Sequence, residues 1–192
     1  NYEFSKWLFN QCNQYNVNMQ YASSASVYGN TTHFKEDGPS DPKSPYAWSK
    51  YLFDRWVTGI HPKIIFQGFR YFNVYGPHEE HKGNQASPIT KFTKQAQEEG
   101  KITIFTDSEN YKRDFICVSD ICKIHEKMFD IKEKGIYNIG TGKAVSFKQV
   151  ADLIAKKYNA KIKYIPMPEN LKHQYQSYTC ANLEKLNTVL KF

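Results

Sequence analysis

An alternation of strand-like and helix-like segments between residues 18 and 77 constrains the fold most. Residues 18–29 predict a short strand that runs into a turn of small and hydroxyl-bearing residues. Residues 64–77 predict one largely apolar strand that a Gly-Pro pair ends. Pro45 lies between them, and proline favours the first turn of a helix. Strand, helix and strand make a βαβ unit, which indicates a parallel sheet.

The same alternation continues along the chain. Helices are expected over residues 1–16, 88–98, 121–129 and 147–158, and strands over residues 102–105, 114–118, 135–139 and 162–165. In the first helix, Phe4, Trp7, Leu8 and Cys12 are expected along one apolar face. Ser119-Asp120 and Ser146 are expected to cap the helices that follow them.

A tyrosine and a lysine on the helix after Pro45 form a chemically useful pair. Tyr46 and Lys50 are four residues apart, so their side chains share one helix face about one turn apart. A fixed positive charge beside a phenol stabilises the phenolate, and Tyr46 could then exchange a proton with an alcohol as it is oxidised. The alternative is an ordinary surface tyrosine with a solvated lysine. Ser24 ends the preceding strand, and ligands collect at that end of a parallel sheet.

Charge and cysteines exclude several classes of protein. The formal charge of +7 suits an anionic ligand, but the lysines are scattered and no nucleic-acid motif is present, so we expect no nucleic acid. The four cysteines lack Cys-x-x-Cys spacing and paired histidines, which argues against a metal site. We expect them to be buried in a reducing compartment, the cytoplasm. No signal peptide or long apolar run suggests export or a membrane span.

Three motifs carry a family resemblance. Ser-Ser-Ala-x-Val-Tyr-Gly stands at residues 23–29, Tyr-x-x-x-Lys at residues 46–50 and Arg-x-x-Asn-Val-Tyr-Gly-Pro at residues 70–77. Together they resemble the extended short-chain dehydrogenase/reductase superfamily of nucleotide-sugar enzymes. Within it, residues 69–83 and 108–115 closely resemble the ADP-heptose 6-epimerases. The resemblance runs from the first residue to about residue 179.

The resemblance implies an α/β fold, a partial Rossmann-type doubly wound parallel sheet with a smaller α/β substrate lobe. Residues 1–77 and 114–142 would form the second half of the Rossmann NADP-binding domain. Residues 78–113 and 143–192 would form the incomplete substrate lobe. No strand with a Gly-x-x-Gly-x-x-Gly turn precedes Asn1, although the family needs that turn to bind the cofactor pyrophosphate. We therefore interpret the chain as a fragment, which by itself would be inactive.

The family roles transfer to individual positions. Tyr46 matches the proton-transfer tyrosine, and Ser24 matches the serine that hydrogen-bonds the reacting hydroxyl. Lys50 matches the lysine that holds the cofactor ribose, and Lys82 matches a second catalytic base beside the cofactor. Asn1 and the backbone of Val74 would also contact the cofactor. The positions that bind substrate in the family are Asn73, Asn84, Lys91, Phe105, Thr106, Asp107, Ser108, Arg113 and Tyr175.

These assignments have ordinary alternatives. Lys82 could be a solvated loop lysine, and Arg113 could form a structural salt bridge instead of binding phosphate. The chain also departs from the family pattern, because Lys91 replaces a common histidine and Thr106-Asp107 stands where a Glu-Gly pair is often found. These departures leave the sugar contacts open, not the reaction class.

The resemblance implies epimerisation at C6 of an ADP-linked heptose. Bound NADP, or NAD in its place, would take hydride from the sugar and return it to the opposite face. A 4-epimerase of another nucleotide sugar would share Ser24, Tyr46 and Lys50 but would not need Lys82. An inactive truncated fragment is the remaining alternative. A 4,6-dehydratase fits less well, since Ala25-Ser26 stands where that chemistry wants an Asp-Glu pair. The expected partners are the ADP-heptose substrate and further copies in a homo-oligomer.

Overall fold

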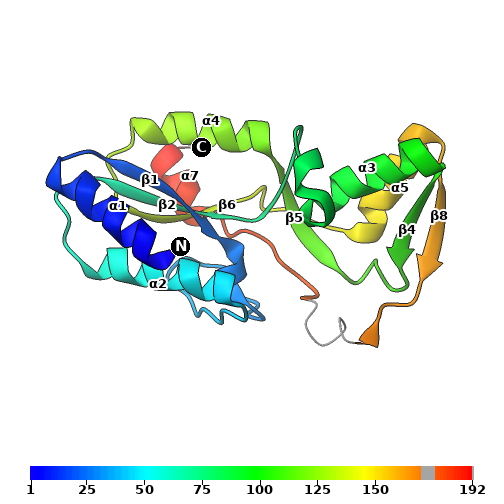
Figure 1. Ribbon diagram of the computed structural model, residues 1–192, viewed down its shortest axis with the longest axis horizontal. Coiled ribbons are helices and arrows are strands. Elements are labelled where there is room, and N and C mark those ends of the chain that lie inside the picture. Colours follow the sequence, from blue (N-terminus) through cyan, green and yellow to red (C-terminus); the bar gives the residue numbers. More distant parts are fainter. Residues whose placement is uncertain (170–175, 192) are drawn as a thin grey trace.

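A three-stranded parallel sheet forms the larger body of the molecule. The computed structural model describes residues 1–169 and 176–191. The sheet has the order β1-β2-β6, with β1 at Met19–Ser24, β2 at Phe66–Tyr71 and β6 at Gly135–Ile139. Figure 1 shows α1 (Tyr2–Gln14) and α2 (Pro45–Gly59) on one side, with α4 (Val118–Phe129) and α7 (Glu184–Leu190) on the other. The predicted α/β class with parallel strands is confirmed.

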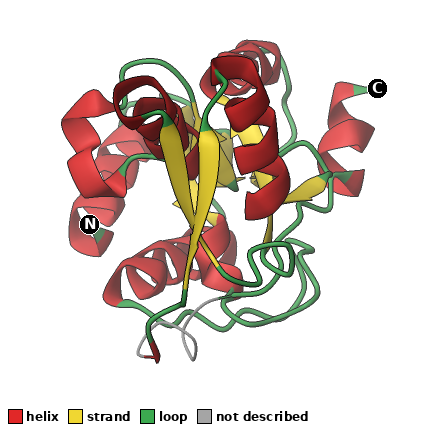
Figure 2. Cartoon of the chain, turned by 90° about the vertical axis from the view of Figure 1, so that its right-hand side faces the viewer, coloured by secondary structure: helices red, strands yellow, loops and turns green. Residues whose placement is uncertain are grey.

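A two-stranded parallel sheet with two helices forms the smaller body. It contains β4 (Lys101–Phe105), β8 (Lys161–Ile165), α3 (Pro88–Glu99) and α5 (Phe147–Tyr158). Figure 2 looks onto this end of the molecule and shows the strands of this sheet with helices beside them. Ile102 and Ile104 of β4 pack with alanines of the two helices, among them Ala96 and Ala151, in a core of its own.

A third sheet joins the two bodies, and it corrects one prediction. It has the order β3-β5-β7, with β3 at Asn73–Tyr75, β5 at Lys112–Cys117 and β7 at Ala144–Ser146. The expected single strand over residues 64–77 is therefore wrong. It breaks at Phe72, whose N–H donates to the Ile139 carbonyl at 2.9 Å. Beyond this bond β3 pairs with β5, so tertiary pairing divides a run that looks continuous in sequence. Short 3₁₀ helices follow β1 (η1, Ala25–Tyr28) and β3 (η2, Glu80–Gln85).

The expected apolar face of α1 is wrong for Phe4 and Trp7, whereas Cys12 packs against the cluster that contains Phe9. Phe9 is fully buried, whereas Phe4 and Trp7 are 63% and 57% exposed. The Phe9 ring makes edge contacts with Phe53, Trp56 and Phe66. Because α1 carries aromatic residues on several sides, the partners that the rest of the molecule offers decide which side is buried. All four cysteines are free. The prediction that they are buried is wrong, because three are only partly buried and Cys122 is exposed.

One helix cap is confirmed and one is wrong. Ser146 accepts a hydrogen bond from the Gln149 N–H, and the Gln149 side chain bonds back to the Ser146 N–H. By contrast, α4 begins at Val118 with Cys117 as its N-cap, so Ser119 lies inside the first turn. The Ser119 hydroxyl donates to Cys117 Sγ at 3.1 Å instead of capping the helix.

The last helix packs on the larger body. Leu186 of α7 is buried in the cluster that contains Phe69 and Ile139 of the central sheet. The expected substrate lobe over residues 78–113 and 143–192 thus ends in a helix that contacts β6. The division into two lobes stays a prediction.

A buried carboxylate ties α2 to the central sheet. Asp54 is 1% exposed and accepts hydrogen bonds from the Tyr21 hydroxyl at 3.0 Å and the Ser23 hydroxyl at 2.9 Å. Its second oxygen also forms an ion pair with Arg70 Nε at 2.9 Å. These donors come from β1 and β2, so Asp54 fixes α2 against both strands.

Replacing Asp54 should strongly destabilise the fold. Asp54→Ala leaves the Arg70 guanidinium buried without its counter-ion, which should lower the free energy of unfolding by about 3–5 kcal/mol. Urea unfolding followed by circular dichroism measures this change. Glu184→Ala is the control, because its ion pair with Lys35 is exposed to solvent and its loss should change stability little. Equal losses in the two variants would contradict a special role for the buried pair.

Candidate functional site

The start of α2 positions the predicted proton-transfer tyrosine. Ser44 caps the helix by accepting a hydrogen bond from the Ala47 N–H at 3.1 Å, and Pro45 occupies the first turn. Tyr46 follows directly and is 50% exposed. Figure 1 shows that α2 begins at the end of the larger body that lies toward the smaller one.

Lys50 joins Tyr46 to the carboxyl end of β1. Its ammonium donates to the Ala22 carbonyl at 2.8 Å and lies 5.7 Å from the centre of the Tyr46 ring. Burial lowers the pKa of Lys50, and the nearby Asp54 carboxylate partly offsets that effect. Ser24 ends β1 two residues after Ala22, and its hydroxyl accepts from the Ser26 N–H at 3.2 Å. The structure thus brings Ser24, Tyr46 and Lys50 to one end of β1.

Sequence reasoning missed Asp54, which completes this helix face. It follows Lys50 by four residues, as Lys50 follows Tyr46, so the three side chains lie along one stripe of α2. Asp54 lies in the core while Tyr46 is exposed. The four-residue spacing is the only signal in the sequence, because its partner Arg70 is not adjacent along the chain.

A second buried carboxylate holds Lys82. The Lys82 ammonium lies 3.3 Å from Glu79 Oε1, at the beginning of η2. Glu79 is 6% exposed and accepts hydrogen bonds from the Ser87 and Thr90 hydroxyls at 2.7 and 2.6 Å. Burial raises the pKa of Glu79, but the hydrogen bonds from Thr90, Ser87 and Lys82 outweigh burial and lower that pKa to about 2. Glu79 is therefore ionised at neutral pH and fixes both Lys82 and the start of α3.

Two other predicted residues lie on the sheet β3-β5-β7, which we call the connecting sheet. The Asn73 amide donates to the Asp114 carbonyl at 3.3 Å and to the Thr179 hydroxyl at 3.4 Å. Arg113 is buried, and its guanidinium donates to the Lys112 carbonyl at 2.9 Å and lies 5.4 Å from the centre of the Phe147 ring. Arg113 is thus held beside the pocket described next.

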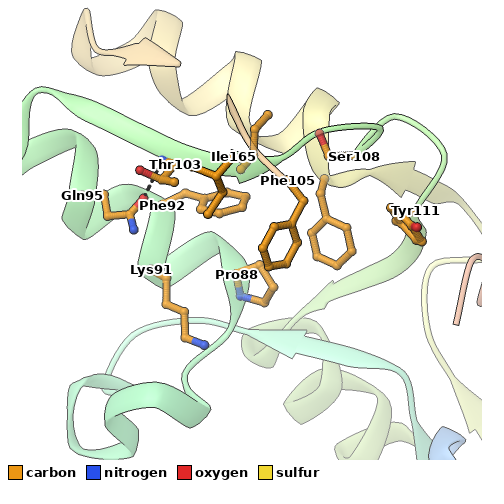
Figure 3. A pocket seen from close by; sticks show the side chains of 11 residues that line it. Pro88, Lys91, Phe92, Gln95, Thr103, Phe105, Ser108, Tyr111 and Ile165 are labelled. Carbon is orange, nitrogen blue, oxygen red and sulfur yellow. Dashed lines mark hydrogen bonds between the residues drawn. The ribbon is translucent and has the colours of Figure 1, made fainter. Parts of the chain in front are cut away.

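The smaller body contains a cavity of about 320 Å³, which we call the aromatic pocket. Figure 3 shows it between α3, β4 and the start of α5. Its aromatic walls are formed by Phe92, Phe105, Tyr111 and Phe147. Its polar lining residues are Lys91, Gln95, Thr103 and Ser108. A volume near the lower limit of small-molecule sites and flat aromatic walls suit a planar ring.

The predicted substrate residues divide between the pocket and its surroundings. Lys91, Phe105 and Ser108 line the aromatic pocket. Thr106 and Asp107 do not line it. The Thr106 hydroxyl donates to the Ile165 carbonyl at 3.1 Å, and Asp107 has a φ of +65° in the turn after β4.

The remaining predicted residues have weaker support. Asn84 is exposed, and its carbonyl accepts from the Lys91 ammonium. Asn1 is exposed at the start of α1, and Val74 lies in β3 opposite Ile116. Tyr175 lies outside the described residues. Within residues 1–169 and 176–191, no three His, Cys, Asp or Glu side chains are grouped so that they could hold a metal ion. None of the described helices combines the length and the apolar character that crossing a membrane requires.

A family model and several solved structures match this chain. The model of the NAD dependent epimerase/dehydratase family matches residues 1–140. The structure is similar to ADP-L-glycero-D-manno-heptose-6-epimerase from Helicobacter pylori, with 28% identity and a TM-score of 0.89 over 100% of this chain. It is also similar to UDP-N-acetylglucosamine 4-epimerase from Methanobrevibacter ruminantium, with 26% identity and a TM-score of 0.87 over 98% of this chain.

A third similar structure is UDP-glucose 4-epimerase from Thermus thermophilus in complex with NAD. It has 26% identity and a TM-score of 0.77 over 94% of this chain. The chain spans 59%, 61% and 60% of the length of these three proteins, in the order given. Their common fold confirms the predicted Rossmann-type architecture.

The Glu79 carboxylate should make stability depend on pH. Its pKa of about 2 in the folded protein lies below the value of about 4.3 expected in the unfolded chain. The carboxylate therefore contributes stability above about pH 4.3, and this contribution is lost as the pH falls toward 2. Compared with wild type, Glu79→Gln should lose up to about 3 kcal/mol at pH 6 and progressively less toward pH 2.

Urea unfolding of both proteins across this pH range measures the difference. Glu98→Gln on the exposed side of α3 is the matched control, and its effect should be small at every pH. A loss in Glu79→Gln that stays constant with pH would show that the ionised carboxylate is not what stabilises this segment.

Proposed function

Since the chain belongs to the NAD dependent epimerase/dehydratase family, we propose that the protein is a nucleotide-sugar epimerase that acts at C6 of an ADP-linked heptose. The observation that carries the proposal is the group formed by Ser24, Tyr46 and Lys50 at the carboxyl end of β1. Support for the sugar comes from the similarity to the Helicobacter pylori heptose epimerase and from Lys82 in its motif.

In this proposal the chain's own residues move the proton. The Tyr46 phenolate accepts the proton of the reacting hydroxyl, and the positive charge of Lys50 stabilises that phenolate. Ser24 holds the hydroxyl in place. Lys82, anchored by Glu79, is the second proton-transfer group and lies on the other face of the reacting carbon. An epimerase needs such a group because the hydride returns to the opposite face. When bound, NADP would supply the acceptor and donor of the hydride.

The residues present suit the ribose side of such a cofactor. The Lys50 ammonium has three N–H donors, and one of them binds the Ala22 carbonyl. Donors therefore remain for the ribose hydroxyls at the end of β1, where parallel sheets bind nucleotides. We assign Asn1, Lys50, Val74 and Lys82 to the cofactor. NADP is proposed, with NAD as the alternative that the family description and the Thermus thermophilus complex favour.

The aromatic pocket and the connecting sheet would bind the substrate. A nucleobase fits the aromatic walls, and Arg113 beside Phe147 offers a guanidinium to the diphosphate. Asn73 and the turn after β4 would contact the sugar and the ribose. The proposal keeps the division into a Rossmann half over residues 1–77 and 114–142 and a substrate lobe in the remainder. We also propose that the protein forms a homo-oligomer and that it is located in the cytoplasm.

A 4-epimerase of another nucleotide sugar is the second candidate. The similarity to the 4-epimerases from Methanobrevibacter ruminantium and Thermus thermophilus favours it. Both candidates use the same tyrosine and lysine, so the substrate distinguishes them.

Substrate assays should separate the two candidates. We expect the full-length protein, supplied with NADP or NAD, to interconvert the C6 epimers of ADP-heptose and to leave UDP-glucose and UDP-N-acetylglucosamine unchanged. Proton NMR of the sugar follows each reaction. Turnover of the UDP sugars alone would replace the C6 proposal with the 4-epimerase, and turnover of none would contradict both.

The roles of Tyr46 and Lys82 predict separate losses of rate. Tyr46→Phe and Lys82→Met should each lower kcat by about 10²- to 10⁴-fold, the usual contribution of a positioned acid or base. The double variant should lose less than the product of both factors, because groups that act together are not additive. Lys94→Met, at an exposed lysine of α3, is the control and should keep the wild-type rate. A Lys82→Met variant as active as this control would remove Lys82 from the mechanism.

A further inference from the structure

Gln95 lines the aromatic pocket, and no step of the proposed function uses it. It lies on α3 one turn after Lys91, so both side chains share one face of the helix. Its Oε1 accepts a hydrogen bond from the Thr103 N–H at 3.0 Å. Figure 3 shows this bond and places Gln95 at one end of the pocket lining.

The strand explains why this bond is strongly favoured. The backbone N–H and C=O groups of the even-numbered residues of β4 face β8. The Thr106 N–H donates to the Ile165 carbonyl, and the Gly100 carbonyl accepts from the Lys161 N–H. Alternation along a strand turns the Thr103 N–H to the opposite edge. A half-buried backbone N–H needs an acceptor, and the Gln95 carbonyl oxygen provides it.

The bond also fixes the orientation of the amide. A backbone N–H can bond only to the amide oxygen, so the Gln95 nitrogen must point away from β4, as drawn in Figure 3. Among the described residues, no hydrogen-bond acceptor engages this nitrogen. It therefore offers two N–H donors at a fixed place. The Lys91 ammonium, on the same helix face, is also a donor only.

We propose that Gln95 is a specificity-determining residue that selects which edge of a nucleobase enters the aromatic pocket. The edge that faces α3 must carry a hydrogen-bond acceptor, either a carbonyl oxygen or an unprotonated ring nitrogen. An exocyclic amine at that edge would meet donors and lose its hydrogen bonds, which is costly in a partly buried site. This inference rests on the proposed function, because it takes a nucleotide as the ligand.

The substitution Gln95→Glu tests the donor alone. Glutamate keeps the shape and the oxygen that binds the Thr103 N–H, but it replaces the N–H donors with an acceptor. We expect the affinity for ADP or UDP, whichever the wild type binds more tightly, to fall about 10- to 100-fold. Isothermal titration calorimetry on the 192-residue chain measures it, since the described chain itself forms the whole pocket lining.

Two controls separate base recognition from charge. The matching nucleoside, adenosine or uridine, has no phosphate to be repelled, so its affinity should fall by the same factor as that of the nucleotide. Gln97→Glu adds the same charge two residues further along α3, outside the aromatic pocket, and should change affinity less than twofold. A loss confined to the nucleotide, or an equal loss in Gln97→Glu, would attribute the effect to charge and overturn the proposal.

The remaining outcomes are also decisive. Equal binding by wild type and Gln95→Glu would overturn the role of Gln95 and leave the proposed function intact. A wild-type chain that binds neither ADP nor UDP at millimolar concentration would overturn both. If Gln95→Glu does not fold by circular dichroism, Gln95→Met removes the same donors without a charge and should lose about tenfold in affinity. Unchanged binding in that variant would contradict the proposal.

Discussion

The buried ion pair between Asp54 and Arg70 is the constraint on which the arrangement of the site depends. A buried charge is tolerated only when it is paired and hydrogen-bonded, so α2 can dock only where Arg70, Tyr21 and Ser23 meet Asp54. Because Lys50 lies one turn earlier on the same helix face, this docking also sets its distance from the end of β1. The exposed part of the site is therefore positioned by its buried part.

Buried carboxylates also hold two other segments of the chain, one through Glu79 and one through Asp114. Glu79 binds Lys82 and the first turn of α3, as described above. Asp114 is fully buried and accepts hydrogen bonds from the N–H groups of Thr141, Gly142 and Ala181. Backbone N–H groups in loops lack the partners that strands provide, and carboxylates with two oxygens satisfy several of them at once. Each loop therefore acquires one defined position.

Local rules allowed part of this to be predicted from the sequence. The start of α2 and the pairing of Tyr46 with Lys50 depend on residues within one or two turns, which the sequence displays directly. The side of α1 that is buried depends instead on Phe53 and Phe66, which lie far along the chain. For the same reason Asp54 and Gln95 escaped prediction, since their partners, Arg70 and the Thr103 N–H, become neighbours only in the fold. The residue types could be read from the sequence, but the choice of partner could not.

Strand β5 relates the two bodies to each other. Arg113 and Asp114 are adjacent on it, so their side chains leave opposite faces of the strand. Arg113 lies beside Phe147 of the aromatic pocket, and Asp114 binds the loop that follows β6 of the central sheet. A nucleotide sugar places its base and its reacting sugar at opposite ends of a diphosphate. In the proposed function, a strand that contacts both the pocket and the central sheet would hold such a ligand at both ends, with the Arg113 guanidinium facing its diphosphate.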